Sequence, residues 1–120
     1  MSSDVISIEG IEGHGYHGVL AEEREQGQRF VVDIEVRLDL ATAATHDDLS
    51  MTVDYSLLAR EALGVIEGEP HQLIETVADR VAQRALAHAG VESVRVTVHK
   101  PEAPVGVRFG DVSVSMVRTR

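Results

Sequence analysis

Four polar side chains, far apart in the sequence, carry groups that could move protons or bind a polar ligand. They are Glu23, Tyr55, Glu75 and Lys100. Carboxylates, phenols and amines are among the groups that proteins use as general acids and bases. Because any one of them could equally be an ordinary surface residue, their importance depends on whether the fold brings them together.

Glu23 lies in an unusually long polar segment between two apolar ones. Residues 14–30 hold two histidines, a tyrosine, three glutamates, two arginines and three glycines. Most connections between secondary-structure elements take only about four to six residues, so a longer one is usually functional or disordered. The segment is not of low complexity, which favours an ordered functional loop. A solvated surface carboxylate remains the simplest interpretation of Glu23 alone.

The other three residues also have structural explanations when each is taken alone. Tyr55 directly precedes a predicted helix, where it could pack as an apolar staple with a solvated hydroxyl. Glu75 falls in the first turn of a second predicted helix, where the helix dipole favours negative charge. Lys100 ends a predicted strand, where a lysine can protect a sheet edge from unwanted pairing.

Composition limits the classes of protein to consider. The length of 120 residues predicts a single domain, residues 1–120, with a modest core. The formal net charge of −9 argues against nucleic acid or an anionic membrane as a partner. The sequence has no cysteine, which excludes disulfides, thiol catalysis and cysteine-bound zinc. There is neither an apolar run of about 20 residues nor a signal peptide, so a cytoplasmic location is expected.

Apolar residues alternate with polar ones in two segments near the N-terminus. The alternation is loose from Val5 to Ile11 and regular from Phe30 to Leu40. A period of two predicts strands with one buried and one solvated face, typical of an antiparallel sheet. These strands would form a wide hairpin, and residues 41–51 would follow as a polar connection.

The second half predicts two helices and two more strands. The first helix would start at Ser56 as N-cap and end before Gly68, and the second would run from about Ile74 to Ala85. Strands are predicted at residues 94–98 and 112–116, while the prolines between them exclude residues 100–106. The order β-β-α-α-β-β predicts an α+β domain, in which both helices cover one face of a four-stranded antiparallel sheet. Its two open edges favour pairing with other copies into a ring. Assembly is also expected because only 3% of the sequence is aromatic, so the core is short of large rings.

Several motifs, together covering almost the whole chain from Ile8 to about Val117, match one known family in order and spacing. They are residues 15–18 (GYHG), residues 22–28 (EEREQGQ) with Phe30, residues 52–55 (TVDY), residues 73–80 (LIETVADR) and residues 98–104 (VHKPEAP). In these motifs the sequence resembles the bacterial dihydroneopterin aldolases of folate biosynthesis. The family pattern departs at residues 105–107, where a second loop proline would be expected.

The resemblance implies a tunnelling fold in which four copies close a ring and two rings stack into a homo-octamer. It also implies a pterin site between neighbouring subunits, with no metal and no cofactor. Carried over by motif, the catalytic residues are Lys100, Tyr55 and Glu23. The substrate-binding set is Glu75, which grips the pterin, the backbone around Val53, Asp54, Leu73 and Ile74, and His17, which lines the pocket or positions the loop. A side-chain role for Asp54 is doubtful.

The implied reaction is the retro-aldol cleavage of 7,8-dihydroneopterin to glycolaldehyde and 6-hydroxymethyl-7,8-dihydropterin. The electron pair of the broken bond can enter the pterin's own C=N bond, so neither a Schiff base nor a metal is required. Lys100 would handle protons near N5 and the side chain, Tyr55 would relay a proton to the enol, and Glu23 would position the lysine or a water. Relatives also epimerise the 2' carbon.

Three alternatives stay open from the sequence. A zinc enzyme of the same fold would use three of His14, His17, His46, His71, His88 and His99, although no His-x-His pair falls on a predicted strand. An epimerase of dihydroneopterin triphosphate would need a basic pocket for its phosphates, with Arg24, Arg29 and Arg108 as candidates. A non-catalytic ring that binds pterins is the third.

Overall fold

The structure, a computed structural model, describes residues 2–120 and confirms the α+β class and the β-β-α-α-β-β order of its main elements. Two short helices and a 3-10 turn interrupt the expected connections. No helix in residues 2–120 is long and apolar enough to cross a membrane. The elements are β1 (Val5–Gly15), α1 (Ala21–Gln26), β2 (Gln28–Arg37), α2 (Ala41–His46), η1 (Leu49–Met51), α3 (Tyr55–Glu67), α4 (Ile74–Leu86), β3 (Ser93–His99) and β4 (Ser113–Thr119).

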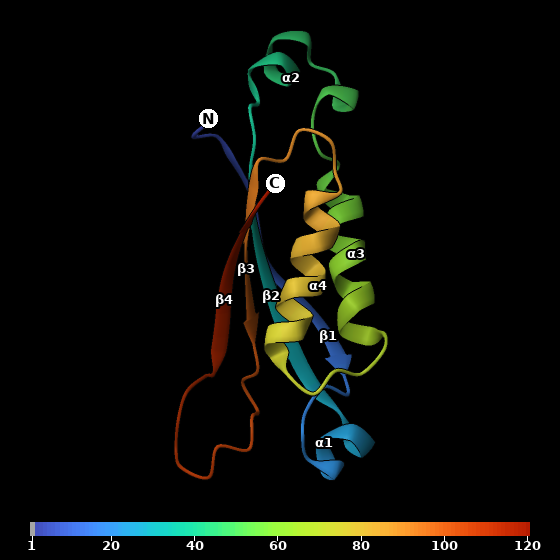
Figure 1. Cartoon of the computed structure of the whole chain (residues 1–120), viewed down its shortest axis with the longest axis vertical. Coiled ribbons are helices and arrows are strands. Elements are labelled where there is room, and N and C mark those ends of the chain that lie inside the picture. The colour runs from blue at the N-terminus through green and yellow to red at the C-terminus, as the bar shows by residue number, and fades with distance from the viewer. Residues whose placement is uncertain (1) are drawn as a thin grey trace.

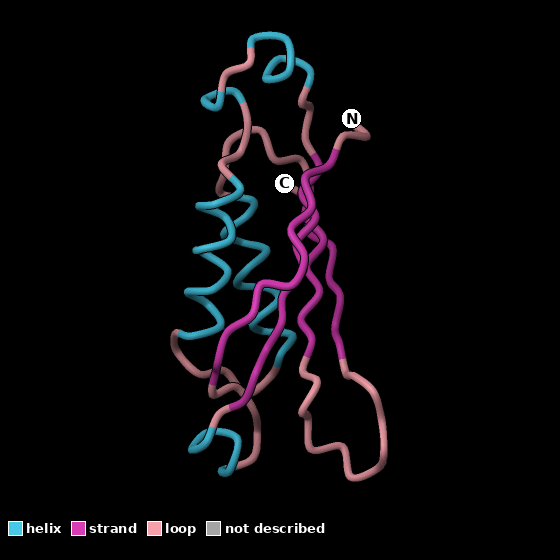
Figure 2. The backbone as a smooth tube through the Cα atoms, turned by 180° about the vertical axis from the view of Figure 1, so that it is seen from behind, coloured by secondary structure: helices cyan, strands magenta, loops and turns pink. Residues whose placement is uncertain are grey.

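The four strands form one antiparallel sheet in the order β1-β2-β3-β4, and helices α3 and α4 lie side by side on one of its faces (Figure 1). Seen from behind, both helices stay on the same side of the sheet (Figure 2). The core lies between these two layers. It includes Phe30, Val32, Ile34 and Val36 from β2, all at most 2% exposed.

The alternation along β2 and β3 is what places the site-forming side chains. Even-numbered residues of both strands face the helices and are buried, while odd-numbered residues face away. Gln28 at the start of β2 shares the buried face with Phe30, and His99 at the end of β3 lies on the open face. Lys100 follows directly, where the strand has ended.

Strand β1 is longer than the sequence predicted, reaching Gly15 instead of ending near Ile11. A β-bulge shifts its register to β2 between Ile8 and Ile11. Gly10 in this bulge has φ = 77°, a conformation that side chains other than glycine rarely adopt. The bulge breaks the alternation of apolar residues, which explains why the pattern hid the second half of the strand.

Helix α3 begins two residues earlier than predicted, because its N-cap is Asp54 and not Ser56. The Asp54 carboxylate accepts hydrogen bonds from the backbone N–H groups of Ser56 (3.0 Å) and Leu57 (3.4 Å). These groups have no acceptor inside the helix, so an N-cap aspartate satisfies them. The prediction of Ser56 as N-cap was wrong, and Tyr55 becomes the first helical residue.

The molecule is elongated, with extents of 51 × 24 × 21 Å. Helix α1, the first turn of α4 and the end of β3 lie at one end (Figure 1). Helix α2 and the start of α3 lie at the other (Figure 1). We call these the Lys100 end and the Tyr55 end, after the residue that each contains.

Candidate active site

Helix α1 carries Glu23, which is only 8% exposed. The Glu23 carboxylate reaches back to accept a hydrogen bond from the Leu20 backbone N–H at 3.2 Å, half of a capping box. Gly18 must be a glycine, because a Cβ there would collide with the Glu23 carboxyl group. The polar loop predicted from the sequence is therefore an ordered structure built around one buried carboxylate.

Lys100 is the only lysine in the sequence, and it pairs with Glu23. Its Nζ lies 2.5 Å from Glu23 Oε2, and its side chain is only 12% exposed. Gln28 Nε2 donates to the same carboxylate oxygen at 3.2 Å. A buried ion pair of this kind is stable only when further hydrogen bonds satisfy the charges, which the Gln28 amide and the Leu20 N–H provide on the carboxylate side.

The Glu23 carboxyl is held in its charged form. Burial raises its pKa, but the hydrogen bond from Lys100, the backbone N–H of Leu20, the charge of Lys100 and the Gln28 amide together outweigh burial. The pKa of Glu23 therefore lies below its ordinary value of 4.5. At neutral pH Glu23 is therefore a carboxylate, and the side chains of both Glu23 and Lys100 are largely closed to solvent.

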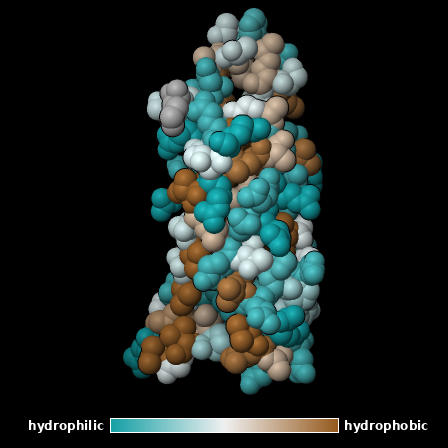
Figure 3. Space-filling model, in the orientation of Figure 1, coloured by the Kyte–Doolittle hydropathy of each residue, from teal (hydrophilic) through white to brown (hydrophobic). Residues whose placement is uncertain are grey.

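Beside this pair is a cavity of about 410 Å³, a size suited to a small heterocyclic ligand. Glu23 and Lys100 form part of its wall, and the first residues of α4 form another part. Figure 3 shows apolar side chains gathered at this end of the molecule. The lining residues are Val19, Leu20, Glu23, Gln72, Leu73, Ile74, Glu75, Lys100, Ala103, Pro104, Val105, Val112 and Val114.

The first turn of α4 supplies the polar groups opposite Lys100. Leu73 is the N-cap, and Ile74 and Glu75 are the first two helical residues. Their backbone N–H groups have no acceptor within the helix, while Glu75 adds a carboxylate that is exposed to the cavity. Five of the residues expected at the site, Glu23, Leu73, Ile74, Glu75 and Lys100, are thus brought together around one cavity.

His17 is not among the residues that line this cavity. It is fully buried, its Nδ1 accepts from the backbone N–H of His71 (3.0 Å), and its Nε2 donates to the Ile66 carbonyl (2.8 Å). Burial, with the charges of His71 and Lys100, lowers the pKa of His17 despite the hydrogen bond to Ile66. The neutral imidazole ties the polar loop to the segment between α3 and α4.

The remaining expected residues, Val53, Asp54 and Tyr55, lie directly before or at the start of α3. Figure 1 shows that this start is the end of the helix farther from the Lys100 end. Helix α3 starts at Tyr55 and spans 13 residues, about 20 Å at the usual rise per residue, before it reaches the Lys100 end. Tyr55 is 63% exposed and Val53 is buried. One chain therefore carries two separate parts of the expected site.

Two residues of the Lys100 end were not expected from the sequence. Gln28 bonds Glu23, and its position in the β2 alternation, two residues before Phe30, would have predicted a buried side chain. His71 stacks on His17 with ring centroids 5.6 Å apart, and its carbonyl accepts from the Gly18 N–H at 2.9 Å. No local pattern in the sequence indicates that residues 18 and 71 touch.

The basic residues suggested for a triphosphate do not line the cavity. Arg24 donates to the Gly18 carbonyl at 3.4 Å. Arg29 pairs with Glu12 at 3.1 Å and with Glu102 at 3.8 Å. Within residues 2–120, no three His, Cys, Asp or Glu side chains form a group that could hold a metal ion.

Comparison with known proteins places the chain in one family. A family model described as dihydroneopterin aldolase matches residues 6–117. The chain belongs to the dihydroneopterin aldolase family. It is 50% identical over 117 residues to the dihydroneopterin aldolase of Streptomyces coelicolor, covering 98% of each chain. The resemblance found in the sequence motifs is confirmed.

Solved structures of the family agree with the fold. The Escherichia coli dihydroneopterin aldolase in complex with neopterin matches with a TM-score of 0.88 and 32% identity, over 96% of this chain and 98% of that one. A Burkholderia dihydroneopterin aldolase bound to guanine matches with a TM-score of 0.77 and 28% identity, over 98% and 91%. Membership in the dihydroneopterin aldolase family makes the chain an aldolase, and hence a carbon–carbon lyase.

Proposed function

We propose that the chain cleaves 7,8-dihydroneopterin by a retro-aldol reaction without metal or Schiff base. The 2'-hydroxyl loses its proton, the C1'–C2' bond breaks, and glycolaldehyde leaves. The electron pair of that bond passes into the conjugated C=N bond at N5, and a proton returned to C1' completes 6-hydroxymethyl-7,8-dihydropterin. Reversal of the cleavage step with the opposite face of the aldehyde would epimerise the 2' carbon.

The observation that carries this proposal is the buried pair of Lys100 and Glu23 beside a cavity of suitable size. An ammonium held 2.5 Å from a carboxylate has no free electron pair, so it favours proton transfer over attack on a carbonyl group. Lys100 therefore serves the substrate as an acid or through a bound water. Glu23 holds it in place through the ion pair.

Glu75 is proposed to orient the pterin ring. The ring edge with N3–H and the 2-amino group presents two parallel donors, which one carboxylate can accept as a fork. Neopterin and guanine, the ligands of two related structures, share this edge. The N–H groups at the start of α4 would complete recognition of the ring's acceptors.

Tyr55 must come from another copy of the chain, because it lies at the far end from Lys100. A contact between the Lys100 end of one copy and the Tyr55 end of another is heterologous, and heterologous contacts that close form rings. Both ends expose apolar side chains that such a contact would bury. They are Val19, Leu20, Leu73, Val105, Val107 and Phe109 at one end, and Leu49, Met51, Tyr55 and Leu57 at the other.

We further propose that the assembly is the octamer of two four-membered rings expected from the sequence. The outer edges of β1 and β4 have no strand partner within residues 2–120. Strand pairing between copies would remove both open edges. The cytoplasmic location expected from the sequence stays a prediction.

The test is incubation of the purified protein with 7,8-dihydroneopterin, with and without a chelator, followed by product analysis. We expect glycolaldehyde and 6-hydroxymethyl-7,8-dihydropterin in equal amounts, at a rate that the chelator leaves unchanged. The triphosphate of the same substrate should react more slowly, since no free arginine lines the cavity. Pterin binding without release of glycolaldehyde would contradict the proposal and favour a binding protein.

A further inference from the structure

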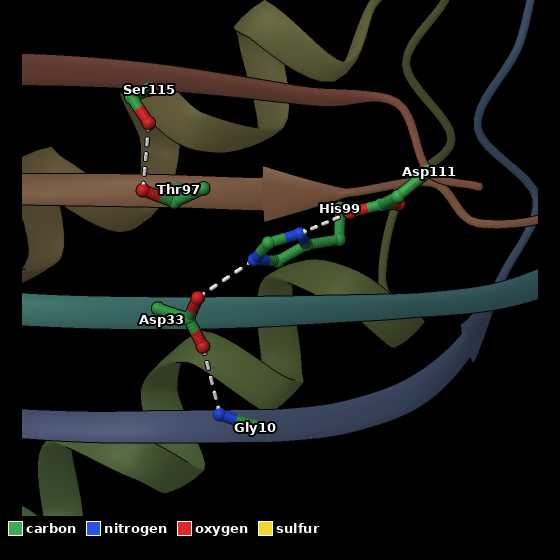
Figure 4. Close-up of polar contacts among 6 residues, drawn as sticks. All are labelled: Gly10, Asp33, Thr97, His99, Asp111 and Ser115. Atoms are coloured by element: carbon green, nitrogen blue, oxygen red, sulfur yellow. Dashed lines mark hydrogen bonds and ion pairs between the residues drawn. The ribbon is translucent and has the colours of Figure 1, made fainter. Parts of the chain in front are cut away.

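His99, the residue before Lys100, is held between two carboxylates on the open face of the sheet (Figure 4). Its Nε2 lies 2.7 Å from Asp33 Oδ2 on β2, and its Nδ1 lies 2.7 Å from Asp111 Oδ2 in the loop before β4. The other oxygen of Asp33 accepts from the backbone N–H of Gly10 in the β1 bulge at 2.9 Å. One imidazole thus joins β1, β2, β3 and the loop that follows Lys100.

Both contacts are hydrogen bonds only when the imidazole is doubly protonated. Ionised carboxylates accept but cannot donate, so each ring nitrogen must carry a proton. Partial burial lowers the pKa of His99, but the hydrogen bonds to Asp111 and Asp33 and the charges of both outweigh burial. The pKa of His99 therefore lies above its ordinary value of 6.5.

Within residues 2–120, the ion pairs of the His99 ring are those with these two carboxylates. From β4, the residue opposite His99 is Ser113, which does not titrate. Further along the open face, Glu9, Glu35 and Arg95 line a hollow of about 230 Å³ together with Asp33. On the other side of Val31, Arg29 is paired with Glu12 and Glu102. These more distant groups include both carboxylates and guanidinium groups.

Residues 100–112 connect this cluster to the cavity. The Lys100 backbone N–H donates to the Val112 carbonyl at 2.7 Å, which closes the loop at its base. The contact of His99 with Asp111 closes it a second time through side chains. Ala103, Pro104 and Val105 of the same loop form one wall of the cavity.

We propose that His99 is a positioning residue, which fixes the loop of residues 100–112 to β2 through its two carboxylate contacts and thereby holds the Lys100 ammonium against Glu23. When the imidazole loses a proton, a lone pair faces a carboxylate and one contact becomes repulsive. The loop base then loosens on the side of the sheet opposite the cavity. This inference rests on the proposed role of Lys100, and it adds a residue that does not touch the substrate.

Two variants and a matched control separate the parts of the proposal. His99→Gln can donate to only one carboxylate, and Asp111→Asn removes the charge on the loop side. Ser115→Ala is the control, because Ser115 bonds Thr97 at 2.8 Å on the same face without contacting the loop (Figure 4). All three are prepared as the full-length assembly.

The first readout is backbone amide exchange of residues 100–112 between pH 5.5 and 9, corrected for the intrinsic rate. We expect the wild type to lose protection above the pKa of His99, as followed by exchange of the histidine C2 hydrogen. His99→Gln and Asp111→Asn should exchange about tenfold faster already at pH 6, while Ser115→Ala matches the wild type. Unchanged protection in both variants would overturn the proposal.

The second readout is the ¹³Cε signal of Lys100, which is unambiguous because the chain has one lysine. We expect it to shift with the titration of His99 in the wild type and to lose that inflection in His99→Gln. In turnover, His99→Gln should lower kcat about tenfold with less effect on KM. If the Lys100 signal did not shift with the titration of His99, the positioning role would be wrong. If the wild type showed that shift but had no aldolase activity, only the proposed function would be wrong.

Discussion

At the scale of single residues, the candidate site contains one buried ion pair whose partners come from distant parts of the sequence. Glu23 sits on a six-residue helix and Lys100 follows a strand, yet their charged atoms lie 2.5 Å apart. Each of the two side chains compensates the buried charge of the other. Because breaking a buried pair costs several kcal/mol, single substitutions here need controls for folding.

The first prediction concerns Lys100. Lys100→Ala should lower kcat by about 10² to 10⁴, the usual contribution of a general acid or base, while neopterin affinity falls less than about tenfold. Arg108→Ala removes a cation from the same loop outside the cavity and should change neither. Lys100→Gln keeps a hydrogen-bond donor for Glu23 and tests whether the loss is due to chemistry rather than folding. Equal losses in turnover and affinity would contradict an acid–base role.

Glu75 should contribute to binding and not to chemistry. Glu75→Gln replaces one acceptor of the fork by a donor, and the lost charge-assisted pair should weaken neopterin binding by roughly 10²-fold. Glu69→Gln is the matched control, since Glu69 is exposed but does not line the cavity. Titration calorimetry with neopterin gives both affinities. A Glu75→Gln protein that binds neopterin as the wild type does would remove Glu75 from the site.

At the scale of elements, the sequence predicted the helices and strands that have a strong apolar period. It missed the elements that depend on tertiary contacts. Strands β2 and β3 and helices α3 and α4 follow from their apolar spacing. Helices α1 and α2 are six polar or small residues each, too short to show a period, so both stayed hidden in connections. Strand β4 runs from Ser113 to Thr119 rather than 112–116 because pairing with β3 extends it.

The cap of α3 gives a prediction at this scale. Asp54→Ala should lower the free energy of unfolding by about 1 kcal/mol, the usual value of an N-cap aspartate. Ser56→Ala, which removes the N-cap predicted from the sequence, should change it by less than about 0.5 kcal/mol. Denaturant titration at one protein concentration measures both. A larger loss of unfolding free energy in Ser56→Ala than in Asp54→Ala would identify Ser56 as the N-cap instead.

At the scale of the whole molecule, residue types and spacing indicated the family, but not how far apart its site residues lie in one chain. The sequence grouped Lys100, Tyr55 and Glu23 by motif. The fold instead puts Tyr55 one full helix away from the other two. That separation follows from the direction in which α3 runs across the sheet, which no local pattern in the sequence encodes.

Two histidines should give the assembly a stability maximum near pH 6.5. His17 has a lowered pKa, so its contribution is complete above 6.5 and is lost as pH falls toward the folded value. His99 has a raised pKa, so its contribution is complete below 6.5 and is lost as pH rises through the folded value. Denaturant unfolding from pH 5 to 9 should therefore show His99→Gln without the alkaline decline. If His99→Gln lost as much stability at alkaline pH as the wild type does, other titrating groups would be responsible for the decline.

The proposed site combines Lys100 of one copy with Tyr55 of another, so two inactive variants should restore activity when mixed. Lys100→Ala still supplies Tyr55, and Tyr55→Phe still supplies Lys100. In a randomly mixed ring, about one interface in four receives an intact residue from each side. Subunits exchanged by co-expression should then recover about a quarter of wild-type turnover, although each variant alone is inactive.

The control for this mixing experiment uses two variants of the same end. Lys100→Ala and Glu23→Gln both damage the Lys100 end, so no interface in their mixture holds an intact pair. Their mixture should stay as inactive as either variant alone, at the same oligomeric mass. If it recovered as well, restoration would reflect improved folding. If the Tyr55→Phe mixture failed to recover while subunit exchange was complete, Tyr55 and Lys100 would not share a site across copies, and the heterologous ring would be wrong.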